Sequence, residues 1–246
     1  MYYVAARGTI WTAGEADAPV LSEIATDSSM PAVGIDWYRR GWVAVALGGA
    51  PVIAVDVSLS ALVDRFPDAA AIGVDMPIGL PEARRAADEL ARAYVGRRRS
   101  SVFMTPPHRV LQAATYAEAN AIAPALTGGK ISQQAWALRH GIEAVATVAA
   151  GDARVIEVHP EVSFRAMTGA ELPYAKSTWN GQALRRAALA RAGIVLPDQL
   201  DAAGHVPVAD VLDAAAVAWS AARYARGEAR SLPPDAARGQ REVIWY

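Results

Sequence analysis

Short apolar runs separated by turn residues open the most regular part of the chain. Residues 32–36, 41–47 and 52–57 are rich in β-branched side chains, and Arg-Arg-Gly and Gly-Gly-Ala-Pro sequences lie between them. This pattern predicts three short strands in an antiparallel meander. Residues 70–75 form a further run with almost no polar side chain, which indicates a central strand covered on both faces.

Helical periodicity dominates the rest of the chain. Residues 58–66 place apolar side chains on one helical face behind an N-cap serine, either Ser58 or Ser60. Residues 154–158 predict one more strand. Helices are expected at about residues 82–95, 116–126, 131–149, 161–167, 182–192 and 208–226, and a strand-like end at 243–246.

The order of these elements predicts one α/β domain over residues 30–246. Helices are expected to flank its sheet, with a helical insertion at about residues 82–150 between the fourth and fifth strands. Residues 1–29 are polar and rich in turn-forming side chains, so they are interpreted as an N-terminal appendage in which residues 3–11 fit a short strand.

The composition of the chain limits the kinds of functional site that it can form. With 246 residues, 53% of them hydrophobic, the chain can bury a substantial core, which excludes disorder as its main state. Lys plus Arg (24) balance Asp plus Glu (25), so any site for a polyanion must be local. The absence of cysteine excludes disulfides, thiol catalysis and thiolate metal sites, and leaves oxygen and imidazole ligands that best suit a hard cation. Without a secretion leader or an apolar run of about 20 residues, a soluble cytoplasmic protein with no membrane partner is expected.

Two aspartates interrupt apolar strand patterns. Asp36 ends the first predicted strand and Asp75 ends the fourth. If these strands are neighbours, both carboxylates emerge at the same edge of the sheet, within reach of one metal ion. The alternative is that each aspartate begins a turn and accepts hydrogen bonds from backbone N–H groups.

Two more aspartates lie on the predicted closing helix. Asp210 near its start is explained by the helix dipole alone. Asp213 lies one turn farther along the same face, among apolar side chains, with no Lys or Arg at its i+3 or i+4 position. A divalent cation would turn the repulsion between these two acids into a shared attraction, so Asp213 is a candidate metal ligand. The alternative is a solvated helix face.

Four segments together resemble a known family. They are VGIDWYRRGWVAVAL, AIGVDMPIGLPE, EVHPEVSFRAMTG and DVLDAAAVAW, in this order from about residue 32 to the end. The chain is similar to an uncharacterised bacterial and archaeal family of predicted RNase H-like nucleases. The resemblance implies an RNase H-like fold with a mixed five-stranded sheet, and acids at positions that correspond here to Asp36, Asp75, Asp210 and Asp213.

Metal-dependent cleavage of nucleic acid is the activity that the resemblance implies. Four carboxylates can approximately neutralise two Mg²⁺ or Mn²⁺ ions, which would activate a water molecule and stabilise the leaving oxygen of a phosphodiester. Asp36, Asp75 and Asp213 are the expected metal ligands, and Asp210 a further catalytic carboxylate. DNA and RNA remain equally open as substrates.

The VIEVHPEV segment adds two candidate catalytic carboxylates. Glu157, His159 and Glu161 share one parity if the segment is extended, so these three side chains could add a metal ligand or assist proton transfer. The alternative is that Glu157 faces solvent on a strand and Glu161 only favours the start of a helix.

Cationic segments are the candidates for substrate binding. Arg97, Arg98 and Arg99 precede Ser100 in a predicted loop, and arginines beside hydroxyl groups suit phosphate contacts. Lys176, in a second loop, is a further phosphate candidate. In both loops the alternative is solvated surface charge.

Other site classes fit poorly. The GGKIS segment at residues 128–132 lacks the first glycine of a P-loop, and the four histidines form no HExxH motif. Two alternatives to a nuclease stay open: an actin-like or sugar-kinase-type enzyme that binds phosphate, although such proteins carry two copies of the fold, and a non-catalytic RNase H-like scaffold.

Overall fold

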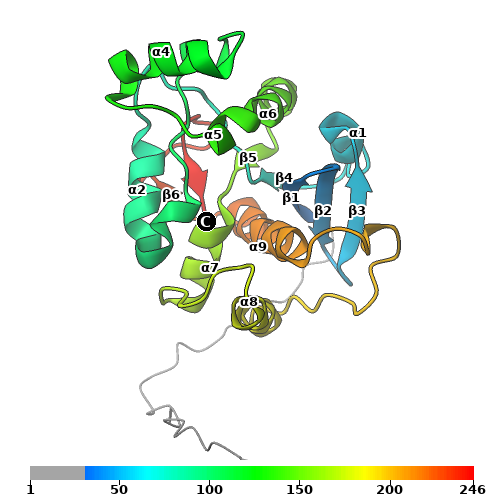
Figure 1. Ribbon diagram of the computed structural model, residues 1–246. Helices are drawn as coiled ribbons and strands as arrows, with labels where there is room; N and C mark the ends of the chain where they lie inside the picture. Colours follow the sequence, from blue (N-terminus) through cyan, green and yellow to red (C-terminus); the bar gives the residue numbers. More distant parts are fainter. Residues whose placement is uncertain (1–30) are drawn as a thin grey trace, which may run out of the picture.

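The computed structural model describes residues 31–246 (Figure 1). The expected appendage at residues 1–29 and the strand considered at 3–11 lie outside the described residues. Between residues 31 and 246, no helix combines the length and hydropathy that a membrane crossing requires.

A five-stranded mixed sheet with the order β3-β2-β1-β4-β5 lies at the centre of the protein. β1 pairs antiparallel with β2 and parallel with β4, β2 pairs antiparallel with β3, and β4 pairs parallel with β5. The α/β class and the mixed five-stranded sheet expected from the sequence are therefore confirmed. The strands are β1 (Ala32–Tyr38), β2 (Gly41–Leu47), β3 (Val52–Asp56), β4 (Ala71–Val74) and β5 (Val155–Glu157).

The first strand is longer than its apolar run predicts. Trp37 and Tyr38 continue the ladder after Asp36 by pairing with Trp42 and Gly41. The Trp37 and Trp42 rings stack with their centroids 5.7 Å apart, and this cross-strand aromatic pair extends the hairpin. Asp36 therefore lies inside β1, and the expectation that it ends the strand was wrong.

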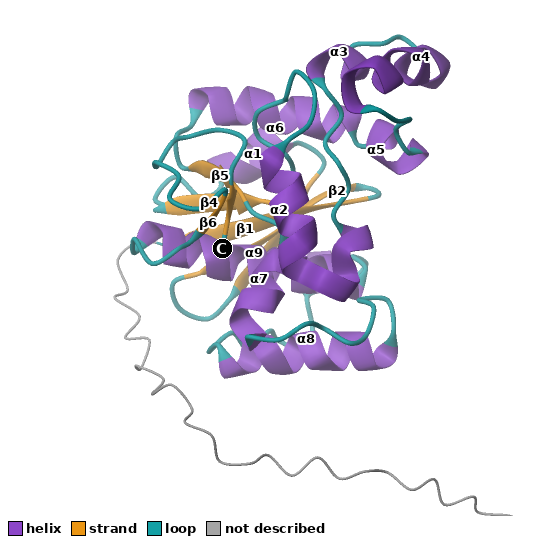
Figure 2. Cartoon of the chain, turned by 90° about the vertical axis from the view of Figure 1, so that its left-hand side faces the viewer, coloured by secondary structure: helices purple, strands orange, loops and turns teal. Residues whose placement is uncertain are grey.

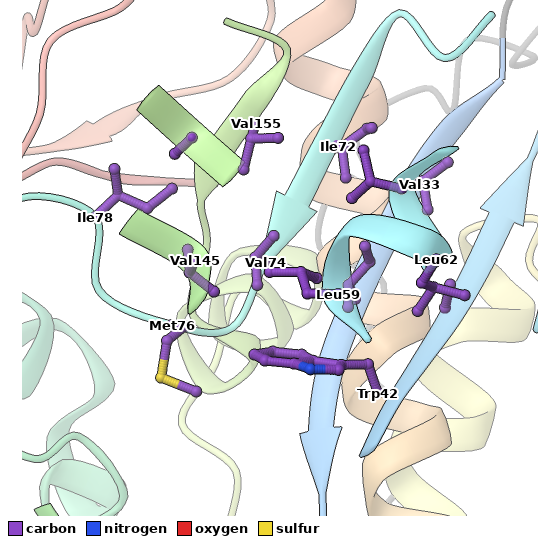
Figure 3. Close-up of a cluster of buried hydrophobic side chains, with 14 of the residues drawn as sticks. Val33, Trp42, Leu59, Leu62, Ile72, Val74, Met76, Ile78, Val145 and Val155 are labelled. Carbon is purple, nitrogen blue, oxygen red and sulfur yellow. The ribbon is translucent and has the colours of Figure 1, made fainter. Parts of the chain in front are cut away.

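Alternating side chains of the central strands face two different sets of helices. Val33 and Ile35 of β1, with Val74 of β4, point towards α1 (Leu59–Asp64) and α6 (Arg139–Gly151), where they form the apolar cluster shown in Figure 3. On the other face α9 (Val208–Ala225) packs against β1, β2 and β4 (Figure 1), and α8 (Trp179–Arg191) packs against α9. Because the side-chain period of a strand is two, Asp36 and Asp75 point to the α9 face.

Two glycines let α9 approach the sheet closely. Gly34 of β1 and Gly73 of β4 are paired in register and share the α9 face. A Cβ atom at Gly34 would overlap the backbone of Ala218, and one at Gly73 would lie 2.8 Å from Val217 Cγ1. These two glycines form what we call the glycine trough, and α9 lies in it.

The segment between β4 and β5 is helical, as expected, but more broken than its pattern predicts. Figure 2 shows α3, α4 and α5 grouped at one corner, away from the sheet. Leu138 ends α5 and precedes α6, so the single helix expected at 131–149 is two helices. Besides α6, the segment contains α2 (Ala86–Val95), the 3-10 helix η1 (Gly96–Ser101), α3 (His108–Leu111), α4 (Tyr116–Thr127) and α5 (Gln133–Ala137).

The C-terminal third brings the chain back to the α9 face. α7 packs against both α8 and α9. A small antiparallel pair of strands follows α9, and Trp245 also forms a parallel bridge to Val158 beyond β5. The elements are α7 (Pro160–Thr168), the 3-10 helix η2 (Asp201–Ala203), β6 (Ser231–Leu232) and β7 (Ile244–Trp245).

Candidate active site

Asp36 and Asp75 lie side by side at one edge of the sheet. β1 and β4 are parallel neighbours, and the Asp75 N–H donates a hydrogen bond to the Ile35 carbonyl at 2.9 Å. Asp36 is only 5% exposed, and its Oδ1 accepts a hydrogen bond from the Trp37 N–H at 2.7 Å. The structure therefore brings together two carboxyls that are 39 positions apart in the sequence.

Burial and mutual repulsion keep this pair from ionising fully. Burial, followed by the charges of Asp75 and Asp213, raises the pKa of Asp36 well above its usual range. Burial also raises the pKa of Asp75 to about 7, although Lys176 and a hydrogen bond from the Asp36 carboxyl oppose the rise. A hydrogen bond between two carboxyls requires a proton on one of them, so the pair does not carry its full double negative charge near neutral pH.

Asp213 completes the cluster from α9. It is 1% exposed, so the interpretation as a solvated helix face was wrong. Its Oδ2 accepts a hydrogen bond from Lys176 Nζ at 2.5 Å, whereas its buried Oδ1 has no hydrogen-bond partner among the described residues. Asp210, one turn earlier and partly buried, has its pKa raised by burial and by the charge of Asp213.

The position of Lys176 differs most from what the sequence pattern predicts. It was expected to be a phosphate-binding loop residue, and the structure puts its ammonium group among the carboxylates. Burial opposes its charge, but the attraction of Asp213, Asp36 and Asp75 is stronger and raises the pKa of Lys176. Because 43% of its side chain is exposed, the ammonium group is within reach of both the cluster and solvent. We call Asp36, Asp75, Asp210, Asp213 and Lys176 the carboxylate cluster.

The donor set suits a divalent ion in part. Within residues 31–246, no group of three or more Asp, Glu or His side chains is arranged to hold one ion together. Mg²⁺, however, commonly keeps several water ligands and binds through one or two carboxylates. Asp36 and Asp75 supply two such carboxylates, and Asp213 has an unpartnered buried oxygen. The cluster therefore fits one hydrated ion at Asp36 and Asp75, with Lys176 as a second positive charge.

Glu157 lies outside this cluster. It is 5% exposed, so the alternative of a solvent-facing Glu157 was wrong. Its Oε2 accepts hydrogen bonds from Arg85 Nη2 at 2.5 Å and from the Ile78 N–H at 2.6 Å. Arg85 also donates to Asp88 and Thr105, and so ties β5 to α2 and to the segment after η1. The structure gives Glu157 a structural ion pair, and its catalytic role stays a prediction.

Glu161 is paired in the same way, by a second buried arginine. Arg185 of α8 is fully buried, and its Nη2 lies 2.5 Å from Glu161 Oε1. The extended parity expected for Glu157, His159 and Glu161 was wrong, because Pro160 starts α7 and His159 becomes its N-cap residue. His159 Nδ1 accepts a hydrogen bond from the Glu161 N–H at 3.2 Å, and burial lowers the pKa of His159.

The arginine segment after α2 lies at the rim of the site. Residues 97–101 form part of the 3-10 helix η1, so the prediction of a loop was wrong; hydrogen bonds such as Ser101 Oγ to the Arg98 carbonyl (2.7 Å) stabilise the turn. Arg97, Arg99 and Ser100 are exposed, and Arg98 is half-buried. Burial lowers the pKa of His159, and the charges of Glu161 and Asp213 and a hydrogen bond with the Ser101 main chain offset part of this lowering. The end of η1 is therefore close to the carboxylate cluster.

A comparison with models of protein families identifies the family of the chain. The family described as "Protein of unknown function (DUF429)" matches residues 34–238. The chain belongs to DUF429. The DUF429 match includes every member of the carboxylate cluster, both glycines of the trough and both buried arginines. No curated protein and no solved structure matches the chain.

Proposed function

We propose that this DUF429 protein is a divalent-metal-dependent phosphodiesterase that acts on nucleic acid. The observation that carries the proposal is the pair of neighbouring carboxyls, Asp36 and Asp75, which the parallel strands β1 and β4 hold at one edge of the sheet and whose pKa values are raised by burial. Burying two adjacent carboxyls destabilises a protein unless a cation or hydrogen-bond donors compensate them. Such a pair is therefore typical of a functional site.

The architecture supports an RNase H-like assignment. The resemblance noted in the sequence implies an acid on the first strand, another after the fourth strand and acids on the closing helix of a mixed five-stranded sheet. Asp36, Asp75, Asp210 and Asp213 occupy these places. A likeness of fold does not establish a reaction, so the proposal depends on the site rather than on the fold.

The residues of the cluster have distinct parts in the proposed reaction. Asp36 and Asp75 would hold Mg²⁺ or Mn²⁺, which when bound supplies a Lewis acid and a more acidic water molecule. Asp213 fixes Lys176 by an ion pair of 2.5 Å, and the half-exposed ammonium group can donate to a phosphate oxygen. Arg99 and Ser100 are exposed and available for further phosphate contacts, whereas Arg97 lies 3.6 Å from Glu171 in a mostly exposed ion pair. We propose that Lys176 replaces the second metal ion expected from the four aspartates.

A second candidate function is supported by the same lysine. Lys176 already compensates part of the negative charge, and no three metal-ligating side chains of residues 31–246 converge on one point. A non-catalytic RNase H-like binding domain would need no more than this. The two candidates differ in their response to metal: the enzyme binds Mg²⁺ or Mn²⁺ at the cluster, whereas the binding domain does not.

Nuclease assays combined with metal titrations test the proposal. Single-stranded, duplex and junction oligonucleotides of DNA and RNA are incubated with the protein and Mg²⁺ or Mn²⁺, and metal binding is followed by calorimetry. We expect metal-dependent cleavage of at least one substrate and one bound ion per chain. Asp36→Asn should lower cleavage by more than about 100-fold, since even partners of metal ligands affect metal sites by 10- to 100-fold.

The matched control is Asp64→Asn, which removes the same charge from an exposed position on α1. It should leave both cleavage and metal binding unchanged. Cleavage that survives in Asp36→Asn would remove the cluster from catalysis. If millimolar Mg²⁺ and Mn²⁺ change neither the calorimetric baseline nor thermal unfolding, the binding-domain candidate is preferred.

A further inference from the structure

A cavity of about 440 Å³ lies between helices α2 and η1 on one side and the segment that connects α4 to α5 on the other. Arg84, Arg92 and Lys130 line it, and the described lining residues include no carboxylate. In a chain with a formal charge of −1, three cations without an acid in one cavity are a local excess of positive charge. We call this cavity the cationic groove.

Main-chain carbonyls, rather than buried carboxylates, hold the two arginines in place. Arg84 Nε donates to the Thr127 carbonyl at 3.0 Å, and Arg92 Nη1 donates to the Val102 carbonyl at 2.6 Å. The one acidic partner, Glu89, is 3.2 Å from Arg84 in a pair that is more than half exposed, and such pairs contribute little. Both guanidinium groups therefore keep positive charge and free N–H donors for an anion.

The GGKIS segment, which fails as a P-loop, forms the opposite wall. Gly128 ends α4 with a φ of +77°, a conformation that favours glycine. A side chain at Gly129 would meet no atom within 4 Å, so the backbone here is open to a ligand. Lys130 is exposed and forms no ion pair with any residue between 31 and 246.

One segment separates the groove from the carboxylate cluster. Val102, Phe103 and Thr105 line the groove and also a small cavity that reaches Asp75 and His159. Thr105 is held on its inner side, because its N–H donates to Asp88 Oδ2 at 2.7 Å and its hydroxyl accepts from buried Arg85. The cationic groove and the small cavity at Asp75 therefore adjoin each other across residues 102–105.

We propose that the cationic groove binds the sugar-phosphate backbone of single-stranded nucleic acid that extends from the carboxylate cluster. The proposal rests on the proposed function for the identity of the ligand. Arginine and lysine beside a partly exposed aromatic ring, Phe103, form the combination that binds single strands through phosphate contacts and base stacking. A cavity of about 440 Å³ has the size of a small-ligand site and so suits a few nucleotides rather than a duplex.

Salt titrations of binding test the groove. Fluorescent oligothymidylate and oligouridylate are titrated with the wild type and with the groove variant Arg84→Gln/Arg92→Gln/Lys130→Gln, in Ca²⁺ to limit cleavage. Each lost phosphate contact should reduce the magnitude of the slope of log K against log[salt] by about 0.7. The slope of the groove variant should therefore be smaller than that of the wild type by about 2. Lys130→Gln alone, which removes no contact of the fold, should lose about 0.7, and Lys130→Arg should keep the wild-type slope.

The matched control variant is Arg186→Gln/Arg191→Gln/Arg230→Gln. These three arginines are exposed and do not line the cationic groove. The control removes the same charge and should keep the wild-type slope. Equal slopes in the groove and control variants, or no binding of either oligonucleotide by the wild type, would each overturn the proposal.

Hydrolysis of a small diester separates this proposal from the proposed function. Bis(p-nitrophenyl) phosphate can be cleaved at the carboxylate cluster without occupying the groove. Metal-dependent hydrolysis that is equal in wild type and groove variant, together with the loss of salt slope, supports both proposals. Without hydrolysis by the wild type, the nuclease assignment fails, whereas a slope lost only in the groove variant still supports the groove.

Discussion

Replacing Asp75 by asparagine should stabilise the metal-free protein. Asp75 has a pKa of about 7 in the folded state, against an ordinary value of 3.8. A carboxyl whose folded pKa is raised favours folding while it is protonated, and this contribution is lost as the pH rises towards the folded pKa. Asparagine cannot ionise, so Asp75→Asn avoids the loss.

The structure sets the size of this effect. A shift of about three pKa units corresponds to about 4 kcal/mol of unfolding free energy between pH 4 and pH 8. The pKa already includes the attraction between Asp75 and Lys176, and the figure is an upper limit because relaxation of the protein and penetration of water reduce the cost of a buried charge. We therefore expect Asp75→Asn to be more stable than the wild type by about 1–3 kcal/mol at about pH 8. In a chain of this size, 2 kcal/mol raises Tm by about 4–8 °C.

Thermal and denaturant unfolding with a chelator, at about pH 5 and pH 8, measures the difference. The advantage of Asp75→Asn should grow with pH. Asp152→Asn is the matched control, because hydrogen bonds from Arg154 lower the pKa of Asp152 and so stabilise its charged form. The free energy of unfolding of this control variant should be lower than that of the wild type by about 1–3 kcal/mol. If Asp75→Asn is less stable than the wild type at about pH 8, Asp75 is a structural hydrogen-bond acceptor and the cluster is not strained by charge.

Three further changes separate the structural contacts from the site. Lys176→Met leaves Asp213 buried without its partner and should lower the free energy of unfolding by about 1–3 kcal/mol. This is less than the 3–5 kcal/mol for a fully buried pair, because the Lys176 side chain is 43% exposed. Calorimetry should show tighter Mg²⁺ binding by this variant, and unchanged affinity would place the ion away from Asp213. Gly34→Ala forces α9 out of the glycine trough and should lower the free energy of unfolding by about 1–3 kcal/mol or more, and a neutral result would contradict the close approach. Arg185→Met should cost about 3–5 kcal/mol, and a double-mutant cycle with Glu161→Gln should recover much of the loss; strict additivity would show that the pair does not interact.

The period of the hydrophobic pattern was sufficient to predict which face of its element each acid of the cluster shares. Alternation in β1 and β4 places Asp36 and Asp75 opposite the apolar positions, and parallel pairing of the strands makes them neighbours. The helical period of residues 208–226 similarly places Asp210 and Asp213 on one face. The face that each acid shares is a local property, because it depends only on the spacing within an element, whereas the pairing of β1 with β4 is a tertiary contact.

The partners of these acids depend on tertiary structure and could not be predicted in this way. Lys176 is 37 positions from Asp213, in an irregular segment with no periodicity. Arg85 is the N-cap residue of α2 and shows no pattern of burial in the sequence. Arg185 did leave a signal: it shares a helical face with Gly181, Ala188 and Leu189, which are all buried, and an arginine on such a face indicates a buried ion pair.

The glycine trough has a consequence for the ion that the proposed site would accept. α9 meets β1 through main-chain atoms at Gly34, so no flexible side chain lies between the helix and the strand to absorb small movements. The separation between Asp36 and the ion pair of Asp213 with Lys176 is thereby set by the backbone, and with it the space for an ion at Asp36 and Asp75. A stiff frame of oxygen atoms discriminates by ionic radius: Mg²⁺ requires ligand distances of about 2.0–2.1 Å, whereas Ca²⁺ takes about 2.3–2.6 Å. On this reasoning the two glycines would favour Mg²⁺ over Ca²⁺ at the proposed site without contacting the ion themselves.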